Sequence, residues 1–152
     1  MKALVKKYAK PGIWMEEVPM PEVGINDVLI KVTKAAICGT DLHMYKWDEW
    51  SQTHCKPPYT MGHEFVGVVA EVGEGVRNFT VGERVTAEGH IVCGHCRNCR
   101  RGMGHVCENT ISVGIMGKDG CFAEYVTIPE SNVVKLRPEI PDDFAAIMDP
   151  FG

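Results

Sequence analysis

Four cysteines lie close enough in the sequence to hold one metal ion. They fall within fifteen residues, at Cys93, Cys96, Cys99 and Cys107. Nearby glycines allow the tight turns that converging thiolates need. Four thiolates are typical of a closed tetrahedral zinc site, with zinc–sulfur distances of about 2.3 Å. Because a closed site has no open position for a substrate, we expect a structural zinc lobe over residues 93–107.

Two other interpretations of these cysteines are weaker. Disulfides between cysteines so close in sequence would require a strained backbone. Iron–sulfur clusters use different spacings and often have a proline after the last cysteine, whereas Glu108 stands there in this chain. We therefore favour zinc for this segment.

A second group of possible ligands is spread more widely along the chain. Cys38 follows an expected strand, and His63 and Glu64 are adjacent further on. Cysteine, histidine and carboxylate all bind zinc, and three such ligands with an open fourth position make a catalytic site. A lone cysteine is, however, more often a small buried hydrophobic residue, and a histidine beside a strand is more often an ordinary polar residue. The residue types alone leave both interpretations open.

Several motifs resemble those of zinc-dependent medium-chain alcohol dehydrogenases. Gly62-His63-Glu64-Phe65-Val66-Gly67 is similar to the zinc signature of that family, and Cys38-Gly39-Thr40-Asp41-Leu42-His43 is similar to its first zinc ligand and proton relay. Gly82-Glu83-Arg84-Val85 resembles a turn-and-strand motif, and residues 93–107 resemble the structural zinc lobe. The resemblance implies two zinc ions. One is catalytic, held by Cys38, His63 and Glu64, and one is structural, held by the four cysteines.

The resemblance also implies roles for three further residues. Thr40 would pass a proton to His43, and His43 would pass it to solvent. Residues three apart share one face of a helix, which suits such a relay. Asp149 stands where the family has a further ligand or nearby carboxylate, often glutamate. Because aspartate is one methylene shorter, we expect Asp149 to act outside the direct ligands. Without the resemblance, Thr40 would be a helix cap, His43 a surface histidine and Asp149 a residue without a role.

Finer features resemble the branch of the family that acts on L-threonine. These features are residues 45–51, 88–90, 93–99 and 146–152. They imply NAD-dependent oxidation of the secondary alcohol of L-threonine, a small amino alcohol, to 2-amino-3-oxobutanoate. Bound zinc lowers the pKa of a hydroxyl group, which favours hydride loss. The resemblance further implies a homo-oligomer, a tetramer at full length. A polyol dehydrogenase of the sorbitol type is the alternative.

Short apolar segments between glycines and prolines predict a mainly β fold. We expect strands over residues 1–8, 13–18, 28–32, 65–72, 83–87, 122–128 and 132–136. Within residues 28–32 every second residue is apolar, as in a half-buried strand. Many short strands at close spacing indicate a barrel or sandwich. The resemblance implies a GroES-like, partly open barrel with a few short helices.

Two helices are expected, and the second bears on domain organisation. One would begin at Thr40 as N-cap, with Asp41 in its first turn. The other would span residues 141–148 and expose Phe144, Ile147 and Met148. The G-x-G-x-x-G turn of a dinucleotide-binding domain does not occur in the sequence. We therefore expect residues 1–152 to be a catalytic domain that ends before a Rossmann domain and lacks activity alone.

Composition narrows the class of protein. Hydrophobic residues make up 45% of the chain, charged residues 24%, and the net charge is −4. This charge argues against nucleic acid and membrane partners. Seven cysteines, an odd number, indicate a reducing cytoplasm rather than a disulfide scaffold.

A zinc-ribbon binding module using Arg97, Arg100 and Arg101 is a competing class, but it would need a basic stripe. A non-enzymatic chaperonin-like barrel would leave the second ligand group unexplained.

Overall fold

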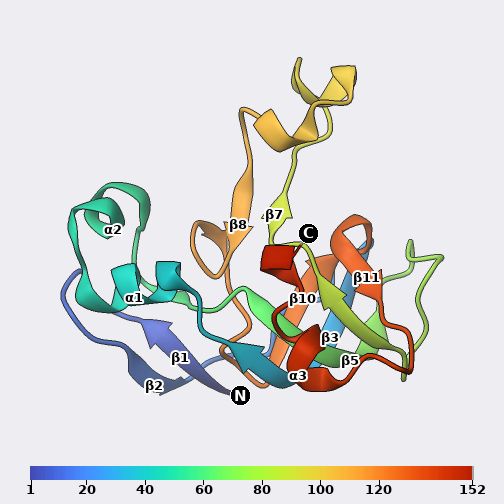
Figure 1. The fold of residues 1–152 in the computed structure, drawn as a ribbon, viewed down its shortest axis with the longest axis horizontal. Coiled ribbons are helices and arrows are strands. Elements are labelled where there is room, and N and C mark those ends of the chain that lie inside the picture. Colours follow the sequence, from blue (N-terminus) through green and yellow to red (C-terminus); the bar gives the residue numbers. More distant parts are fainter. Residues whose placement is uncertain (152) are drawn as a thin grey trace.

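The computed structural model describes residues 1–151, which form three small antiparallel or mixed sheets and a few short helices (Figure 1). The largest sheet has five strands in the order β10-β3-β5-β6-β11. Its strands are β3 (Asp27–Ala36), β5 (Glu64–Val72), β6 (Arg84–Ala87), β10 (Tyr125–Pro129) and β11 (Val133–Lys135). All its pairings are antiparallel. Over the described residues β10 and β11 are edge strands, so the mainly β, GroES-like barrel is open, as predicted.

The core lies on one side of this sheet, and the alternation of apolar residues explains its position. Val28 and Ile30 of β3 are fully buried, and Val32 packs against the same cluster. Side chains alternate between the two faces of a strand, so these three residues share the inner face. The other buried members of the core are Phe65, Val69, Val76, Val85, Ala87, Val113, Cys121, Val126, Ile128 and Val133.

A second sheet of three strands, in the order β2-β1-β4, packs beside the first. It consists of β1 (Lys2–Lys6), β2 (Trp14–Glu17) and β4 (Tyr59–Thr60). The Leu4 backbone N–H donates to the carbonyl of Phe122 at 2.7 Å, and Met61 N–H donates to Leu4 O at 3.1 Å. These bonds connect the N-terminal strand to the segments that flank the second ligand group.

The third sheet carries the cysteine-rich segment away from the body of the protein. It comprises β7 (His90–Ile91), β8 (Ile111–Val113) and β9 (Gly117–Lys118). Figure 1 shows β7 and β8 rising from the main sheet, with the segment between them at their far end. That segment contains two 3₁₀ turns, Cys99–Arg101 and Gly104–Val106. The Asn132 side-chain amide donates to the carbonyls of Glu88 at 3.0 Å and His90 at 2.8 Å, which holds the base of this projection.

The helices differ from the sequence prediction in their limits. Helix α1 spans Gly39–Lys46, and its N-cap is Cys38, so the prediction of Thr40 as N-cap is wrong. The Asp41 carboxylate accepts the Cys38 backbone N–H at 2.9 Å, and this contact starts the helix earlier than the residue types indicated. Helix α2 (Glu49–His54), capped by Asp48, was not predicted.

The last helix, α3 (Asp142–Ala145), is shorter than the predicted span and is followed by a 3₁₀ turn at Asp149–Phe151. A further 3₁₀ turn spans Glu130–Asn132. Phe144 is 66% exposed, as expected. The expectation for Met148 is wrong, because this residue packs against the buried cluster of Val66 and Ala145. Among the described residues no helix is long and apolar enough to span a bilayer.

Candidate metal centres and active site

The four cysteines of the projecting lobe converge on one point. Their sulfur atoms all lie within 4.8 Å of one another. Cys93 and Cys107 are separated by 3.6 Å between sulfurs, and Cys96 and Cys107 by 4.0 Å. A disulfide has a sulfur–sulfur bond of about 2.05 Å, and all seven cysteines are free thiols. The arrangement therefore has the donor set of a closed, four-thiolate zinc site.

Backbone N–H groups point at these sulfurs. Cys96 N–H donates to Cys93 Sγ at 3.3 Å, and Cys99 N–H donates to Cys96 Sγ at 3.4 Å. The Asn109 N–H donates to Cys107 Sγ at 3.3 Å. Hydrogen bonds from the backbone, chiefly from His95 N–H, lower the pKa of Cys93 to about 6. Such donors favour the thiolate form, which is the form that binds a metal.

The second ligand group is assembled by strand pairing. Cys38 Sγ, a ring nitrogen of His63 and a carboxylate oxygen of Glu64 lie within 4.8 Å of one another. Ala36 at the end of β3 pairs directly with Glu64 at the start of β5. This register places Cys38, two residues beyond Ala36, next to the residues that open β5. His63 and Glu64 are buried and Cys38 is half-buried, so the group is closed except near Cys38.

Glycines make room for the segment that carries His63. Gly62 has a φ of +90°, and a Cβ there would lie 2.3 Å from Cδ1 of Phe122. Gly114 has a φ of +67°, and its Cβ would lie 2.0 Å from the Gly62 carbonyl oxygen. Both positions therefore exclude a side chain. The backbone at Gly114 packs closely against the backbone at Gly62, and this packing fixes the position of the neighbouring residue, His63.

Asp41 belongs to this site, although the residue pattern did not reveal it. Its side chain is buried, and Oδ1 lies 3.9 Å from His63 Nδ1. Among the described residues these two atoms are the buried side-chain atoms without a hydrogen-bond partner. Burial raises the pKa of the Asp41 carboxyl above its ordinary value. Its place three residues after Cys38 was the available signal, because that spacing allows a helix-capping contact.

Thr40 and His43 lie on α1 but differ in their surroundings. Cys38 Sγ and Thr40 Oγ1 are 3.7 Å apart, so Thr40 lies at the edge of the second ligand group. His43 is 56% exposed, and its Nδ1 contacts the Asp48 carboxylate. No direct hydrogen bond links Thr40 to His43 within residues 1–151. Thr40 therefore lies beside the second ligand group and His43 lies at the surface.

Asp149 lies near the second ligand group without joining it. Its Oδ1 accepts the Gly89 backbone N–H at 3.2 Å. A Cβ on Gly89 would be 3.7 Å from the Cβ of His63 and 3.8 Å from Asp149 Oδ1. Asp149 is thus separated from His63 by one glycine residue. The three convergent ligand atoms come from Cys38, His63 and Glu64.

Two other cysteines are buried in apolar surroundings. Cys121 Sγ lies 3.6 Å from the Glu64 carbonyl oxygen, and burial raises the pKa of this thiol. Burial likewise raises the pKa of Cys55. A raised pKa keeps both sulfurs protonated at neutral pH and poor as nucleophiles or ligands.

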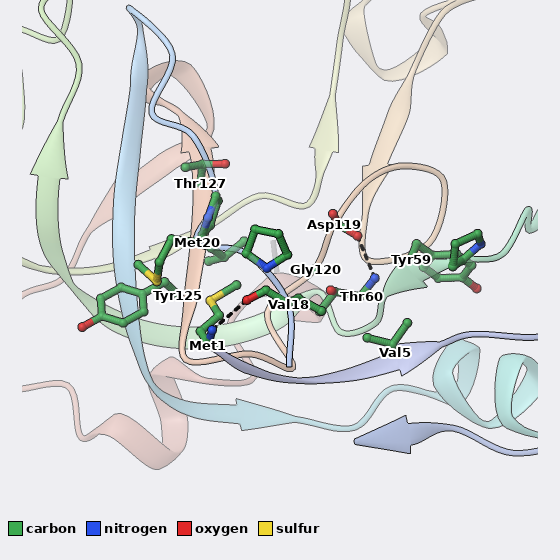
Figure 2. Close-up of a pocket in the computed structure, with 14 residues that line it drawn as sticks. Met1, Val5, Val18, Met20, Tyr59, Thr60, Asp119, Gly120, Tyr125 and Thr127 are labelled. Carbon is green, nitrogen blue, oxygen red and sulfur yellow. Dashed lines mark hydrogen bonds between the residues drawn. The ribbon is translucent and has the colours of Figure 1, made fainter. Parts of the chain in front are cut away.

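A cavity of about 330 Å³ lies between the N-terminal strand and β10, apart from both ligand groups (Figure 2). Two of its polar groups are bonded within the protein. The N-terminal amine donates to Val18 O at 2.7 Å, and Asp119 accepts the Thr60 N–H at 2.7 Å. The cavity contains no residue of either ligand group.

Residues 24–140 match the alcohol dehydrogenase GroES-like domain family, and the chain belongs to this family. It is 60% identical over its whole length to an L-threonine 3-dehydrogenase of Mesorhizobium japonicum, of which it covers 44%. The chain therefore spans less than half the length of this curated relative.

Two solved structures have the same fold over nearly the whole chain. Galactitol-1-phosphate dehydrogenase from Escherichia coli is 28% identical with a TM-score of 0.88, covering 99% of this chain and 42% of that one. An alcohol dehydrogenase from Escherichia coli CFT073, solved in complex with NADH, is 37% identical with a TM-score of 0.86 and the same coverage, 99% and 42%. At this coverage both similarities include the sheets and the lobe.

Proposed function

We propose that this chain is the catalytic domain of an NAD-dependent zinc dehydrogenase that oxidises the secondary alcohol of L-threonine to 2-amino-3-oxobutanoate. The observation that carries the proposal is the convergence of Cys38, His63 and Glu64 in a family whose relatives bear the name L-threonine 3-dehydrogenase. The length of those relatives supports a further nucleotide-binding domain beyond residues 1–152, because the chain covers 44% of them.

The two ligand groups would hold two zinc ions with different roles. Cys93, Cys96, Cys99 and Cys107 supply four sulfurs, which complete a tetrahedral shell and suit a structural ion. The second group supplies three ligands, which leaves one position for an alcohol. Asp41 Oδ1 lies 3.9 Å from His63 Nδ1, where it can orient the imidazole ring and leave the other ring nitrogen for the ion. A zinc ion at this position supplies Lewis acidity, which lowers the pKa of the substrate hydroxyl group.

The protein's own residues would remove the proton that the alcohol loses. Thr40 lies beside Cys38, where its hydroxyl can accept a proton from the substrate and donate its own. His43 lies further along α1 in contact with solvent, where it can release the proton. Because no direct hydrogen bond joins these residues within residues 1–151, a water molecule would bridge them. Asp149 would act on the Gly89 backbone beside His63 rather than as a ligand.

Three further features of the whole protein are part of the proposal. NAD would be the hydride acceptor, supported by the NADH in the similar Escherichia coli structure. The seven free thiols support a reducing compartment such as the cytoplasm. A homo-oligomer, a tetramer at full length, is proposed from the family resemblance alone.

A polyol is the second candidate substrate, because the fold is similar to galactitol-1-phosphate dehydrogenase at a TM-score of 0.88. The test is NADH formation by the full-length enzyme with L-threonine, other amino alcohols, sorbitol and sugar phosphates. We expect the largest kcat/KM with L-threonine. A larger kcat/KM with a polyol would identify the second candidate as the substrate. Absence of turnover with every alcohol would overturn the proposed dehydrogenase function.

A further inference from the structure

Asp48 connects two structural features through the two oxygens of one carboxylate. Its Oδ1 accepts the Ser51 backbone N–H at 3.1 Å and the Ser51 hydroxyl at 3.2 Å, which caps the start of α2. Its Oδ2 contacts His43 Nδ1 on α1. One side chain therefore caps one helix and holds a histidine of the preceding helix.

The turn between the helices fixes this contact. Helix α1 ends at Lys46, and the next residue, Trp47, is its C-cap and has a φ of 55° in the left-handed region. The Trp47 N–H donates to the His43 carbonyl at 2.9 Å, and the next residue, Asp48, is the N-cap of α2. Because the connection between the helices is so short, the Asp48 carboxylate stays next to His43 as long as both helices are formed.

The other neighbours of His43 do not compete for Nδ1. The Trp50 ring lies 5.9 Å from the imidazole, at a tilt of 49°. His54 stacks on Trp50 at 4.8 Å, and its own Nδ1 contacts the Trp50 carbonyl. Within the described residues, Asp48 is the charged group that is hydrogen-bonded to His43.

We propose that Asp48 is a positioning residue for His43, which it holds in the tautomer that carries hydrogen on Nδ1 and leaves Nε2 free to accept a proton. An ionised carboxylate only accepts hydrogen bonds, so it selects the Nδ1–H form of a neutral imidazole. The relay role of His43 rests on the proposed function. The tautomer itself does not, because it follows from the contact with Asp48.

The ionisation of Asp48 supports this assignment. The hydrogen bond from His43 and then the Ser51 N–H lower the pKa of the Asp48 carboxyl below its ordinary value. The side chain is therefore a carboxylate at neutral pH, where it can accept from both partners. A protonated acid could instead donate to Nδ1 and select the opposite tautomer.

The test uses two substitutions that retain the helix cap. Asparagine and serine cap helices about as well as aspartate, so Asp48→Asn and Asp48→Ser remove the charge facing His43 and preserve the start of α2. In the full-length enzyme we expect kcat to fall about 10- to 100-fold in both, part of the roughly 10²–10⁴-fold that general acid–base catalysis contributes. The KM for L-threonine and the zinc content should stay unchanged, and added imidazole should restore part of the rate.

Nitrogen NMR of histidine-labelled protein reads the tautomer directly, with the His43 signals assigned by their loss in His43→Asn. We expect the Nδ1–H form in the wild type and a shift towards the Nε2–H form in Asp48→Asn. The control is Ser51→Ala, which loses the hydroxyl contact but keeps the carboxylate and should match the wild type.

A wild-type tautomer together with a wild-type kcat in Asp48→Asn would overturn the inference while leaving the proposed function intact. Absence of alcohol oxidation by the wild-type enzyme would overturn the proposed function instead. In that case the NMR measurement would still decide whether Asp48 positions the His43 ring.

Discussion

Asp41 Oδ1 and His63 Nδ1 lie 3.9 Å apart in the interior, and neither atom has a hydrogen-bond partner within residues 1–151. A carboxylate facing one ring nitrogen orients the imidazole and leaves the other nitrogen available to a metal ion. A contraction of about 1 Å would form a hydrogen bond. Asp41 therefore lies where it can orient His63 in the second ligand group. The same carboxylate accepts the Cys38 N–H at the start of α1.

Replacing Asp41 with asparagine should lower the zinc affinity of the Cys38–His63–Glu64 group by about 10- to 100-fold, the usual effect of losing an orienting carboxylate. The asparagine side chain retains an oxygen that can accept the Cys38 N–H, so the helix start should survive. Chelator competition measures the affinity. Zinc in the four-cysteine lobe is the internal control, and an unchanged affinity at the second group would show that Asp41 does not support His63.

Cys99→Ser should cost one zinc ion per chain and lower the melting temperature. Metal binding at such a lobe contributes directly to the free energy of folding, and the lobe projects from the main sheet with few other supports (Figure 1). Elemental analysis and thermal unfolding measure the two effects. Cys55→Ala is the matched control, because Cys55 belongs to neither group. Retention of both zinc ions in Cys99→Ser would contradict the assignment.

Cys38→Ser and His63→Ala should each empty the second site and leave zinc in the lobe. Cys38 and His63 lie at the ends of strands β3 and β5 of the main sheet, whereas the four cysteines lie in the segment between β7 and β8. Zinc content before and after mild chelation would distinguish the sites. Simultaneous loss of both ions would mean that they form one folding unit or that the ligands are misplaced.

His43→Asn should slow alcohol oxidation by the full-length enzyme about 10²–10⁴-fold near neutral pH, the usual contribution of general acid–base catalysis. Zinc content should not change, because His43 is not a member of either ligand group. Steady-state NADH formation across pH is the measurement. His54→Asn, which alters the histidine stacked on Trp50, serves as control. Wild-type rates at every pH would remove His43 from the mechanism.

Glu130 should make stability sensitive to acid. Its carboxylate accepts the backbone N–H groups of Arg77 at 2.9 Å and Asn78 at 2.6 Å, and these bonds hold its pKa below the ordinary value of 4.5. A pKa lowered by folding stabilises the protein above the unfolded-state pKa, and that stability is lost as pH falls through the lowered value.

Glu130→Gln should therefore be less stable than the wild type at neutral pH, and the difference should shrink below about pH 4.5. Denaturant unfolding at a series of pH values measures the free-energy difference. Glu139→Gln changes an exposed carboxylate and controls for charge. A difference that is constant with pH would exclude the two backbone contacts as its cause.

The seven predicted strands and the four-cysteine lobe have local signals, whereas the two- and three-residue strands β4, β7, β8 and β9 were not predicted. Alternating apolar residues determine which face of β3 is buried, and the spacing of Cys93 to Cys107 brings four sulfurs together within one short segment. Helix limits were less predictable. Thr40 has the residue type of an N-cap, but the Asp41 carboxylate accepts the Cys38 N–H and moves the start of α1 to Gly39.

The amino-acid sequence alone determined the ligand types, the family motifs and the mainly β fold of this protein. Tertiary structure decided which distant residues meet. Cys38 and His63 are separated by 25 positions in the sequence, and they converge because Ala36 pairs with Glu64 across β3 and β5. The role of Asp41 depends on burial beside His63, and that of Asp48 on a short turn between two helices. In both cases folding brings two side chains into contact, and the residue types and their spacing in the sequence do not reveal that contact.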